Sequence, residues 1–600
     1  MRFHTRWCAI LLVVGLLLSG CQPTDPPDGP GSSAAESQQG QISSSATAPA
    51  VMTTQKEGET TGTKEGPGAT TRPNTVTSSE VVKTALSLGD VAAIAAKKPP
   101  AVAPRSVPNS NSLPSSTHNK EKVITMKKFD VPENRKSSSK IKFDVVLSNK
   151  AVLQAHMPVR IWGTTTLGDV DLAAIVKNTK TGDTRTFYGT ASGGEFEIWL
   201  GATEYGGPYE ITVCSQDGQC QTISDVLFGE VYILGGQSNM GWAIGQCYDG
   251  KVSKLLYQKE IDSSANDNLR EMLVWPVSST EPVKKLDSCR QWQGISPSSV
   301  VNVSAVGYFF GQKLQEELKV PVGLVSSCMG ATSLSTWLPG FAWYNGMISP
   351  INKMTVRGVL WYQGEGDPTE YGERLARLIR RWREEFQNPD MLFHVIQLPR
   401  YVNAETWYLC REEDKKVCSF VDKCTYSVNI DTGLLPNMIA EGDTLNTVED
   451  PTVAGIHPYQ KKEVGIRAAD ALLEKVYGAK GCWTSPYLTS CTAVEDGSVL
   501  LQFDNVAEGL VLRGLAGFEA AGADGKYVDV KPVMVGKTAV SISWDKKEKI
   551  VSVRYGYTNN SSFIQGEITN CAQCVSLYNT VNGKVAYPAE QFTANVAAPK

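Results

Sequence analysis

One short segment, an apolar run followed by two glycines and a serine, constrains the fold of this chain most strongly. Residues 231–234 are all apolar, a length that suits one buried strand and is too short for a typical helix. Gly235 and Gly236 then relax the turn, so that Ser238 can be held outward at the strand end. Several hydrolase folds present a nucleophilic serine in this way, with its backbone N–H beside the carbonyl it attacks. The pattern predicts a nucleophile at Ser238; the alternative is a tight turn with a buried serine.

The histidines narrow the choice of a base for that serine. A serine hydroxyl attacks well only when a base takes its proton, and the usual base is histidine. Of the five histidines, His4 and His118 lie in an export segment and a low-complexity stretch. His156 belongs to a separate β pattern, and His394 lies inside an apolar strand pattern that is typical of a core imidazole. His457, in a loop before an amphipathic helical pattern, is the predicted base.

Several blocks carry a family resemblance. Residues 236–240 (GQSNM), 361–365 (WYQGE) and 456–458 (IHP) follow one another along the chain. Between the first two lies the block 326–332 (SSCMGAT). In this order the blocks resemble the sialate O-acetylesterase group of SGNH (GDSL-like) hydrolases, with Met329 in place of the first glycine of the family's Gly-Gly-Thr block.

The resemblance implies roles for residues around a reacting ester. Ester hydrolysis builds negative charge on the carbonyl oxygen, which needs hydrogen-bond donors aimed at it in advance. The family's donors correspond to the backbone N–H groups of Ser238 and Gly330 and to the side chain of Gln363. Asn239 and Glu365 are expected to orient neighbouring groups rather than to act on the substrate.

The sequence departs from the family pattern beside the histidine. Many SGNH hydrolases carry an aspartate three residues before the histidine, to orient its ring and stabilise the imidazolium. Here that residue is Ala454. Either Ser238 and His457 act as a dyad, or a carboxylate such as Asp450 or Glu449, or a backbone carbonyl, holds the imidazole.

The N-terminus has the layout of an export signal. Arg2 and Arg6 precede an apolar stretch over residues 9–18, which is about half of the ~20 residues that a membrane span needs. The following Leu-Ser-Gly-Cys resembles a bacterial lipoprotein cleavage box, so residues 1–21 are expected to be a signal peptide and Cys21 to carry lipid. A bacterial surface or periplasmic location is expected, and the glutamine after Cys21 favours the outer membrane.

Residues 22–139 are expected to form a disordered stalk. The segment is rich in Ser, Thr, Pro and Gly and nearly lacks aromatic residues, so it cannot bury enough apolar surface to fold. Residues 81–96 form a weak helical pattern, the exception within this stretch. Such a stalk would let the catalytic part reach polymers away from the membrane.

The rest of the chain predicts three folded parts. Residues 140–228 alternate apolar and polar positions, which predicts an N-terminal β-sandwich-like domain, and 481–600 return to short strands and predict a second one. Residues 229–480 alternate strands with helices, which indicates an α/β fold with a parallel sheet and helices on both faces. The resemblance, which covers about residues 140–595, implies the SGNH-hydrolase, flavodoxin-like version of that fold.

Cysteine use agrees with export. Fourteen cysteines are present, and twelve remain when Cys8 and Cys21 are set aside, an even number suited to an oxidising compartment. The close pairs that invite local disulfides are Cys214 with Cys220, Cys482 with Cys491, and Cys571 with Cys574. The three that cluster in one insertion, for which a zinc site is the alternative to disulfides, are Cys410, Cys418 and Cys424.

The expected function is that of a carbohydrate O-acetylesterase in which Ser238 attacks the acetyl carbonyl and His457 takes its proton. The resemblance favours O-acetylated sialic acid as substrate, with acetylated xylan or another glycan as alternatives. A different class is a surface lipoprotein that binds glycans without turnover, which Ala454 and Met329 leave open. No metal or cofactor is expected. Interspersed charges with a net value of −4 and the lack of a Gly-rich phosphate loop give no sign of a nucleic-acid partner.

Overall fold

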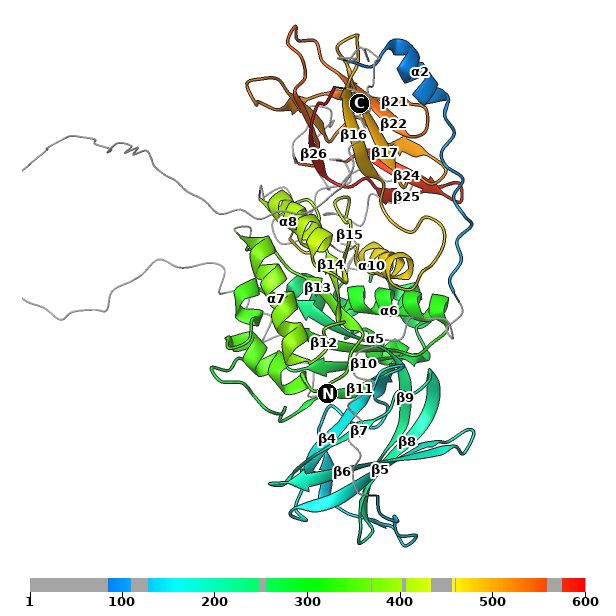
Figure 1. Ribbon diagram of the computed structural model, residues 1–600, viewed down its shortest axis with the longest axis vertical. Helices are drawn as coiled ribbons and strands as arrows, with labels where there is room; N and C mark the ends of the chain where they lie inside the picture. The colour runs from blue at the N-terminus through cyan, green and yellow to red at the C-terminus, as the bar shows by residue number, and fades with distance from the viewer. Residues whose placement is uncertain are drawn as a thin grey trace, which may run out of the picture. The chain divides into compact units, whose positions relative to one another are not determined.

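The computed structural model describes most of the chain from residue 85 onward (Figure 1). The described residues are 85–108, 128–247, 255–367, 370–401, 406–432, 456–458, 460–557 and 575–598. The predicted signal peptide with Cys21 lies outside them, as do Asp450, Glu449 and Ala454. No helix within the described ranges is long and apolar enough to cross a membrane.

A largely parallel sheet forms the centre of the α/β region (Figure 1). Its strands are β9 (Gln219–Gly236), β10 (Asn266–Val274), β11 (Cys289–Ile295), β12 (Val322–Cys328), β13 (Gly358–Tyr362), β14 (Leu392–Ile396) and β15 (Cys424–Ser427). The order is β11-β10-β12-β9-β13-β14-β15, and β11 alone among them runs antiparallel to its neighbour. Without the β10–β11 pair the chain order is 2-1-3-4-5, as in flavodoxin-like sheets.

Helices cover both faces of this sheet, which confirms the predicted α/β class. The long helices are α6 (Ala305–Leu318), α7 (Tyr371–Glu385), α8 (Trp407–Phe420) and α10 (Lys461–Lys475). Leu234 of β9 lies against Gly307 of α6, where a methyl group would not fit. The next residue, Gly235, pairs with Trp361 of β13, which packs edge to face on Trp382 of α7 with ring centroids 5.8 Å apart. Because successive residues of a strand point to opposite faces, α6 and α7 lie on opposite sides of the sheet.

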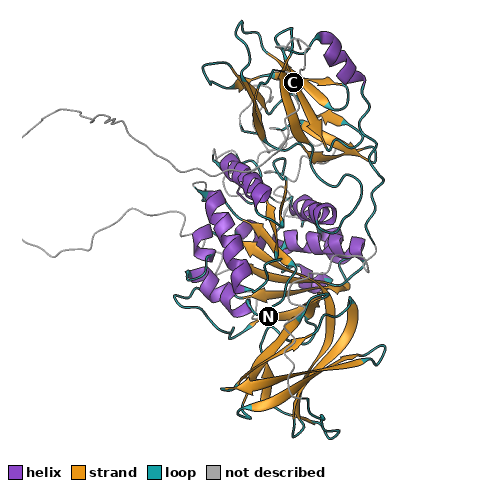
Figure 2. Cartoon of the chain, in the orientation of Figure 1, coloured by secondary structure: helices purple, strands orange, loops and turns teal. Residues whose placement is uncertain are grey.

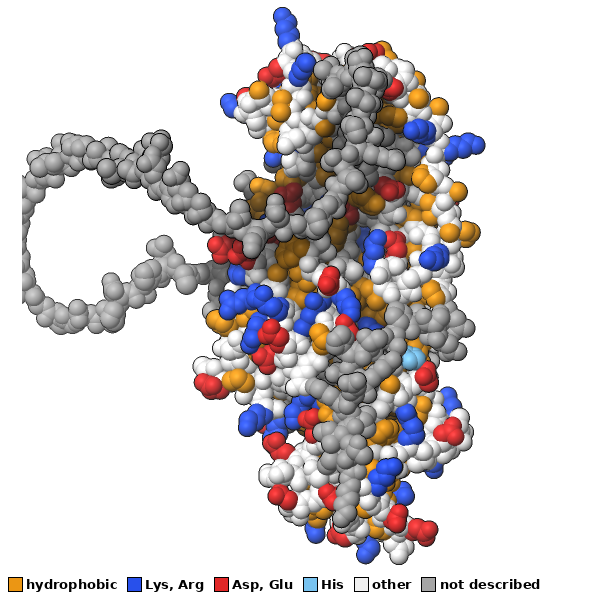
Figure 3. Space-filling model, in the orientation of Figure 1, with side chains coloured by type: hydrophobic (Ala, Val, Ile, Leu, Met, Phe, Trp, Pro, Cys, Tyr) orange, Lys and Arg blue, Asp and Glu red, His pale blue; other side chains and the backbone are white. Residues whose placement is uncertain are grey.

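Shorter helical turns connect these elements. They are α3 (Ser238–Gly241), α4 (Gln258–Asp262), α5 (Pro297–Val300), the 3₁₀ turns η2 (Ile244–Gln246), η3 (Leu334–Trp337) and η5 (Ser349–Ile351), and the π-helical turn η4 (Tyr344–Ile348). Apart from α2, the helices gather in the α/β region (Figure 2). On the face shown in Figure 3, basic and acidic side chains are intermixed.

The N-terminal β region shares a strand with the α/β region. Its strands are β1 (Lys136–Ser137), β2 (Ile141–Phe143), β3 (Val152–Gln154), β4 (Val159–Thr165), β5 (Val170–Asn178), β6 (Thr184–Ser192), β7 (Glu195–Leu200) and β8 (Gly206–Ser215). They continue from β9 in the order β9-β8-β5-β6-β7-β4-β2, while β1 and β3 pair with β9 in parallel. The predicted boundary after residue 228 therefore falls inside β9, because one strand continues from one region into the other.

The C-terminal β region has its own buried core and three small sheets. They contain β16 (Tyr487–Ala493), β17 (Val499–Asp504), β22 (Ala539–Ser543) and β21 (Lys531–Val535); β18 (Leu510–Leu512), β24 (Leu577–Val581) and β25 (Lys584–Pro588); and β20 (Val528–Asp529), β19 (Phe518–Ala521), β23 (Ser552–Tyr555) and β26 (Phe592–Asn595). For both flanking regions, the β-sandwich class stays a prediction.

The stalk prediction is wrong for residues 85–108. Helix α2 (Leu88–Ala96) starts at a capping box formed by Ser87 and Asp90, inside the weak helical pattern. The apolar side chains of Val91 and Ile94 pack on a small cluster of the C-terminal region. Arg105 stacks over the ring of Trp483 at 4.2 Å and donates to a backbone carbonyl. A few apolar anchors and one arginine thus order a segment whose average composition suggested disorder. The stalk prediction also fails at its end, where β1 pairs with β9.

The structure tests part of the cysteine pattern. Cys214 and Cys220 form the disulfide expected from their spacing. The pairing of Cys482 with Cys491 is wrong, because both are free thiols and the sulfur of Cys482 contacts backbone carbonyls instead. Cys571 and Cys574 lie outside the described residues. No group of three or more possible metal ligands occurs among the residues that the structure describes.

Candidate active site

Ser238 and His457, 219 residues apart in sequence, lie in hydrogen-bond contact. Ser238 begins α3 directly beyond the end of β9, and its Oγ lies 2.8 Å from Nε2 of His457. The last residue of β9, Gly236, is paired with Cys328 of β12 on one side and with Tyr362 of β13 on the other. The serine thus stands beyond the carboxyl ends of the central strands, where open α/β sheets place their sites.

Backbone geometry at Gly236 allows this presentation. Its φ of +121° is one that residues with a side chain rarely adopt. A Cβ at this position would also collide with the backbone carbonyl of Tyr362. The strand can therefore turn into α3 between its two neighbours only with glycine at this position.

His457 is covered by Trp242, whose indole stacks on the imidazole at 4.4 Å between ring centroids and 22° between planes. Burial, and secondarily the charge of Lys461, lower the pKa of His457 to about 4. The imidazole is therefore neutral at neutral pH, the form in which it can accept the serine proton. Its Nδ1 is buried and has no hydrogen-bond partner within the described ranges.

The predicted oxyanion donors Gly330 and Gln363 differ in their surroundings. Gly330 lies beside the serine, since a Cβ built on it would be 3.3 Å from Cβ of Ser238. Gln363, directly after β13, has both amide hydrogens engaged: Nε2 donates to Asp367 Oδ2 at 2.9 Å and to the carbonyl of Thr332 at 3.2 Å. The side-chain amide of Gln363 is thus fully engaged in this structure, and its role as an oxyanion donor stays a prediction. Its Oε1 is buried without a partner among the described residues.

Asn239 and Glu365 form a buried network behind the dyad. Asn239 Nδ2 donates to Glu365 Oε1 at 2.6 Å and to the carbonyl of Ile456 at 2.9 Å. Gln237 Nε2 also donates to Glu365. Burial raises the pKa of Glu365 above its usual value. Lys461 Nζ donates to Asn239 Oδ1 at 2.5 Å, and burial lowers the pKa of this lysine to about 8.

Three residues of the site did not emerge from the sequence as site residues. Trp242 follows Ser238 by four residues, and Lys461 follows His457 by four, on the first turn of α10. Asp367 lies four residues before the start of α7 at Tyr371, and its carboxylate binds Gln363 and the backbone N–H of Leu334. Helical spacing from a catalytic residue would have identified Lys461, whereas Asp367 carries no such signal.

Two further histidines among the described residues lie outside the dyad. His394 is fully buried in β14, and its Nδ1 lies 2.9 Å from the hydroxyl of Thr425. His156 lies in the N-terminal β region, 3.5 Å from Glu204.

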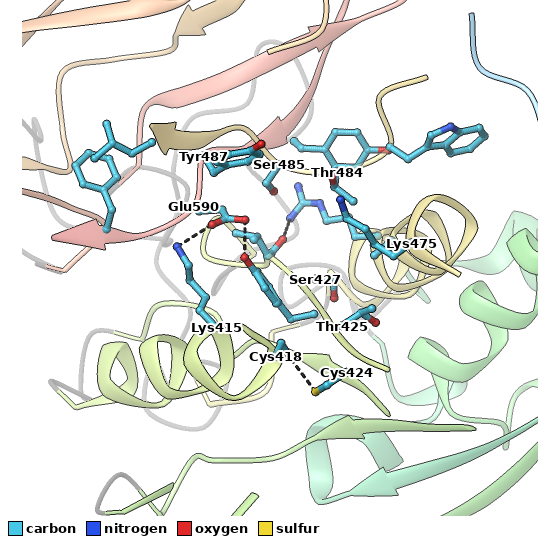
Figure 4. Close-up of a pocket in the computed structure, with 18 of the residues that line it drawn as sticks. Lys415, Cys418, Cys424, Thr425, Ser427, Lys475, Thr484, Ser485, Tyr487 and Glu590 are labelled. Atoms are coloured by element: carbon cyan, nitrogen blue, oxygen red, sulfur yellow. Dashed lines mark hydrogen bonds and ion pairs between the residues drawn. The ribbon is translucent and has the colours of Figure 1, made fainter. Parts of the chain in front are cut away.

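A separate cavity of about 650 Å³ lies away from the dyad, lined by α8, β15, α10 and residues before β16 (Figure 4). Its polar groups satisfy one another: Glu590 accepts from Lys415 at 2.7 Å and from the hydroxyl of Tyr426 at 2.8 Å. The sulfur atoms of Cys418 and Cys424 lie 2.8 Å apart in its wall. None of the described polar side chains that line it is buried without a hydrogen-bond partner.

Comparisons with known proteins find similarity to carbohydrate esterases. Residues 228–436 match the sequence model of a family described as carbohydrate esterase, sialic acid-specific acetylesterase, which confirms the resemblance. Sialate O-acetylesterase of Homo sapiens is 25% identical over 292 residues, covering 42% of this chain and 55% of that protein. The enzyme of Mus musculus is 24% identical over 323 residues, covering 42% and 58%. The chain thus spans little more than half the length of these curated relatives.

A solved structure extends the likeness beyond the central region. A carbohydrate acetylesterase from Xanthomonas citri superimposes with a TM-score of 0.62 and 26% identity, covering 76% of this chain and 99% of that one. His457 lies outside the range matched by the family model, so its place in the site rests on the geometry alone.

Proposed function

We propose that this chain, whose central region matches the sialic acid-specific acetylesterase model, is a carbohydrate O-acetylesterase that uses Ser238 and His457. The observation that carries the proposal is the 2.8 Å contact between the serine hydroxyl and an imidazole kept neutral by burial. A nucleophile and its base within hydrogen-bond reach are what acyl transfer requires.

The reaction follows from these two side chains. Ser238 Oγ attacks the acetyl carbonyl carbon while His457 Nε2 takes the hydroxyl proton. The tetrahedral intermediate collapses, the bond between the acetyl carbon and the sugar oxygen breaks, and His457 returns the proton to that oxygen. Water then attacks the acetyl-serine with His457 again as base, which releases acetic acid and restores the serine.

The negative oxygen of each intermediate needs donors. Ser238 and Gly330 lie side by side beyond the ends of β9 and β12, and their backbone N–H groups are the first two donors that we propose. Gln363 serves as a third donor only when its amide gives up the longer contact, the one with Thr332 at 3.2 Å. Its contact with Asp367 at 2.9 Å can stay in place meanwhile.

O-acetylated sialic acid is the substrate that we propose first, because the family model and the curated relatives are named for it. Acetylated xylan or another acetylated glycan is the alternative, supported by the carbohydrate acetylesterase of Xanthomonas citri. For the cellular setting we propose a lipid anchor on Cys21 at a bacterial surface; a Cys21→Ser variant that still incorporates radiolabelled palmitate would rule it out.

Acetate release is the experiment that tests the function. Residues 85–600, wild type and Ser238→Ala, are assayed on p-nitrophenyl acetate, O-acetylated sialic acid and acetylated xylan. We expect the variant to lose at least 1000-fold in kcat, with one natural substrate preferred. Equal release by both proteins, or none from either, would overturn the esterase proposal and leave glycan binding without turnover.

A further inference from the structure

The carboxamide of Asn239 is fixed in one orientation by its partners. Its Oδ1 accepts from the ammonium of Lys461 at 2.5 Å, and its Nδ2 donates to Glu365 and to the carbonyl of Ile456. Lysine can only donate and a backbone carbonyl can only accept. A rotated amide would set its oxygen against two acceptors and its nitrogen against the ammonium. Lys461 therefore decides which way this amide points.

The same amide connects the two halves of the dyad. Asn239 follows Ser238 in α3, and the carbonyl that it binds belongs to Ile456, the residue before His457. Each end of the hydrogen bond is thus one residue from a reacting group. This bond fixes the backbone of the histidine segment relative to the serine helix.

The surroundings of the Lys461 ammonium point to a role at the dyad. Its side chain is fully buried, and its Nζ also lies 5.6 Å from the ring centroid of Tyr362. The titratable groups that face it are the Glu365 carboxylate and the Cys247 thiol, and its charge acts on His457. A buried ammonium costs free energy unless it is paired, so its presence behind the dyad calls for a role.

We propose that Lys461 is a positioning residue for the dyad, whose ammonium orients the Asn239 carboxamide so that it holds the Ile456 backbone, and with it His457, at Ser238. The inference rests on the proposed esterase function. It also assigns an electrostatic effect, because a cation near the imidazole disfavours its protonated form.

The test compares Lys461→Met with Lys462→Met. Lys462 is the next residue of α10, and its ammonium pairs with Glu260 at 2.7 Å, away from the dyad. In Lys461→Met we expect kcat on p-nitrophenyl acetate to fall on the order of 10- to 100-fold with KM within two-fold, since misplacing a base by about 1 Å has such an effect. The acid limb of its pH–rate profile should also move to higher pH. Lys462→Met should match the wild type in both measurements.

A double-mutant cycle identifies the route. If Lys461 acts through the amide, adding Lys461→Met to Asn239→Ala lowers kcat no further. If the two residues act independently, the fold-losses in kcat of the single variants multiply in the double variant. A double variant whose loss in kcat is the product of the two single losses would overturn the inference. So would a Lys461→Met enzyme within two-fold of wild-type kcat.

Two safeguards keep the outcomes distinct. Should Lys461→Met not fold by circular dichroism, Lys461→Leu, which is also uncharged and has no hydrogen-bond donor, carries the same cycle with the same criteria. Failure of the esterase proposal shows itself separately, because wild type and Ser238→Ala would then release acetate equally. An active wild type, an inactive Ser238→Ala and an unimpaired lysine variant would refute the positioning role alone.

Discussion

Ser238 is positioned by backbone geometry, whereas His457 is positioned by the side chains around it. The serine follows a long strand fixed between two neighbours, and a glycine with positive φ turns the chain into α3. The histidine is held by a stacked indole and by an amide that a buried lysine orients. A change to the backbone at Gly236 disrupts the fold as well as the site, whereas a change to a side chain around His457 can weaken the site alone. The nucleophile is therefore the rigid half of the site, and the base is the half that mutation can adjust.

The largest effect should come from disrupting the backbone turn at Gly236 with Gly236→Ala. The new Cβ meets the Tyr362 carbonyl at a φ that alanine avoids, so we expect a destabilisation on the order of 3 kcal/mol and a kcat loss of at least about 100-fold. Urea unfolding and acetate release measure the two. The control is Gly366→Ala, where a Cβ meets no atom within 4 Å; equal stability of the two variants would contradict the argument.

A smaller effect, dependent on pH, should follow from exposing the base with Trp242→Ala. Loss of the stacked indole hydrates the imidazole and lets its pKa rise from about 4 toward the ordinary value of about 6.5. A protonated imidazole cannot accept the serine proton, so kcat/KM at pH 5 should fall by about 30-fold while the rate at pH 8 changes little. Trp544→Ala in the C-terminal region is the control, and an unmoved acid limb in Trp242→Ala would count against burial as the cause.

On the serine side of the site, the Asp367 carboxylate holds the Gln363 side chain, and Asp367→Asn tests whether this contact affects catalysis. The Asp367 carboxylate binds the Gln363 amide, the Leu334 N–H and the Arg374 guanidinium. An asparagine keeps one acceptor and loses the charge, which should weaken the support of the oxyanion side by about 1–2 kcal/mol and lower kcat by about ten-fold. Glu370→Gln, an exposed change three residues on, is the control. A loss as large as that of Gly236→Ala would erase the contrast between the two halves.

The sequence predicted what local pattern determines. The helix over Lys461–Lys475 and the strand before Ser238 follow from periodicity and length, and the ordered blocks brought Ser238 and His457 to one site. Contacts between segments that are far apart in the sequence could not be predicted from these local patterns. Asp367 has the sequence context of a helix cap, yet its partners include a residue 33 positions earlier. The continuity of β9 was missed because its exposure pattern changes from alternating to fully buried within one strand.

The smallest expected effect concerns the third catalytic group. The Nδ1 atom of His457 has no partner in the described part of the chain, which does not include Asp450, and burial lowers the pKa of the imidazole to about 4. The acid limb of kcat/KM should therefore lie near pH 4, and Asp450→Asn should leave both the limb and kcat unchanged. A carboxylate on Nδ1 would stabilise the imidazolium, raise the pKa and move the wild-type limb toward pH 6.5 or above. A limb at that pH that shifts downward in Asp450→Asn, but not in Glu449→Gln, would identify Asp450 as a third member and add a charged side chain to those that position the base.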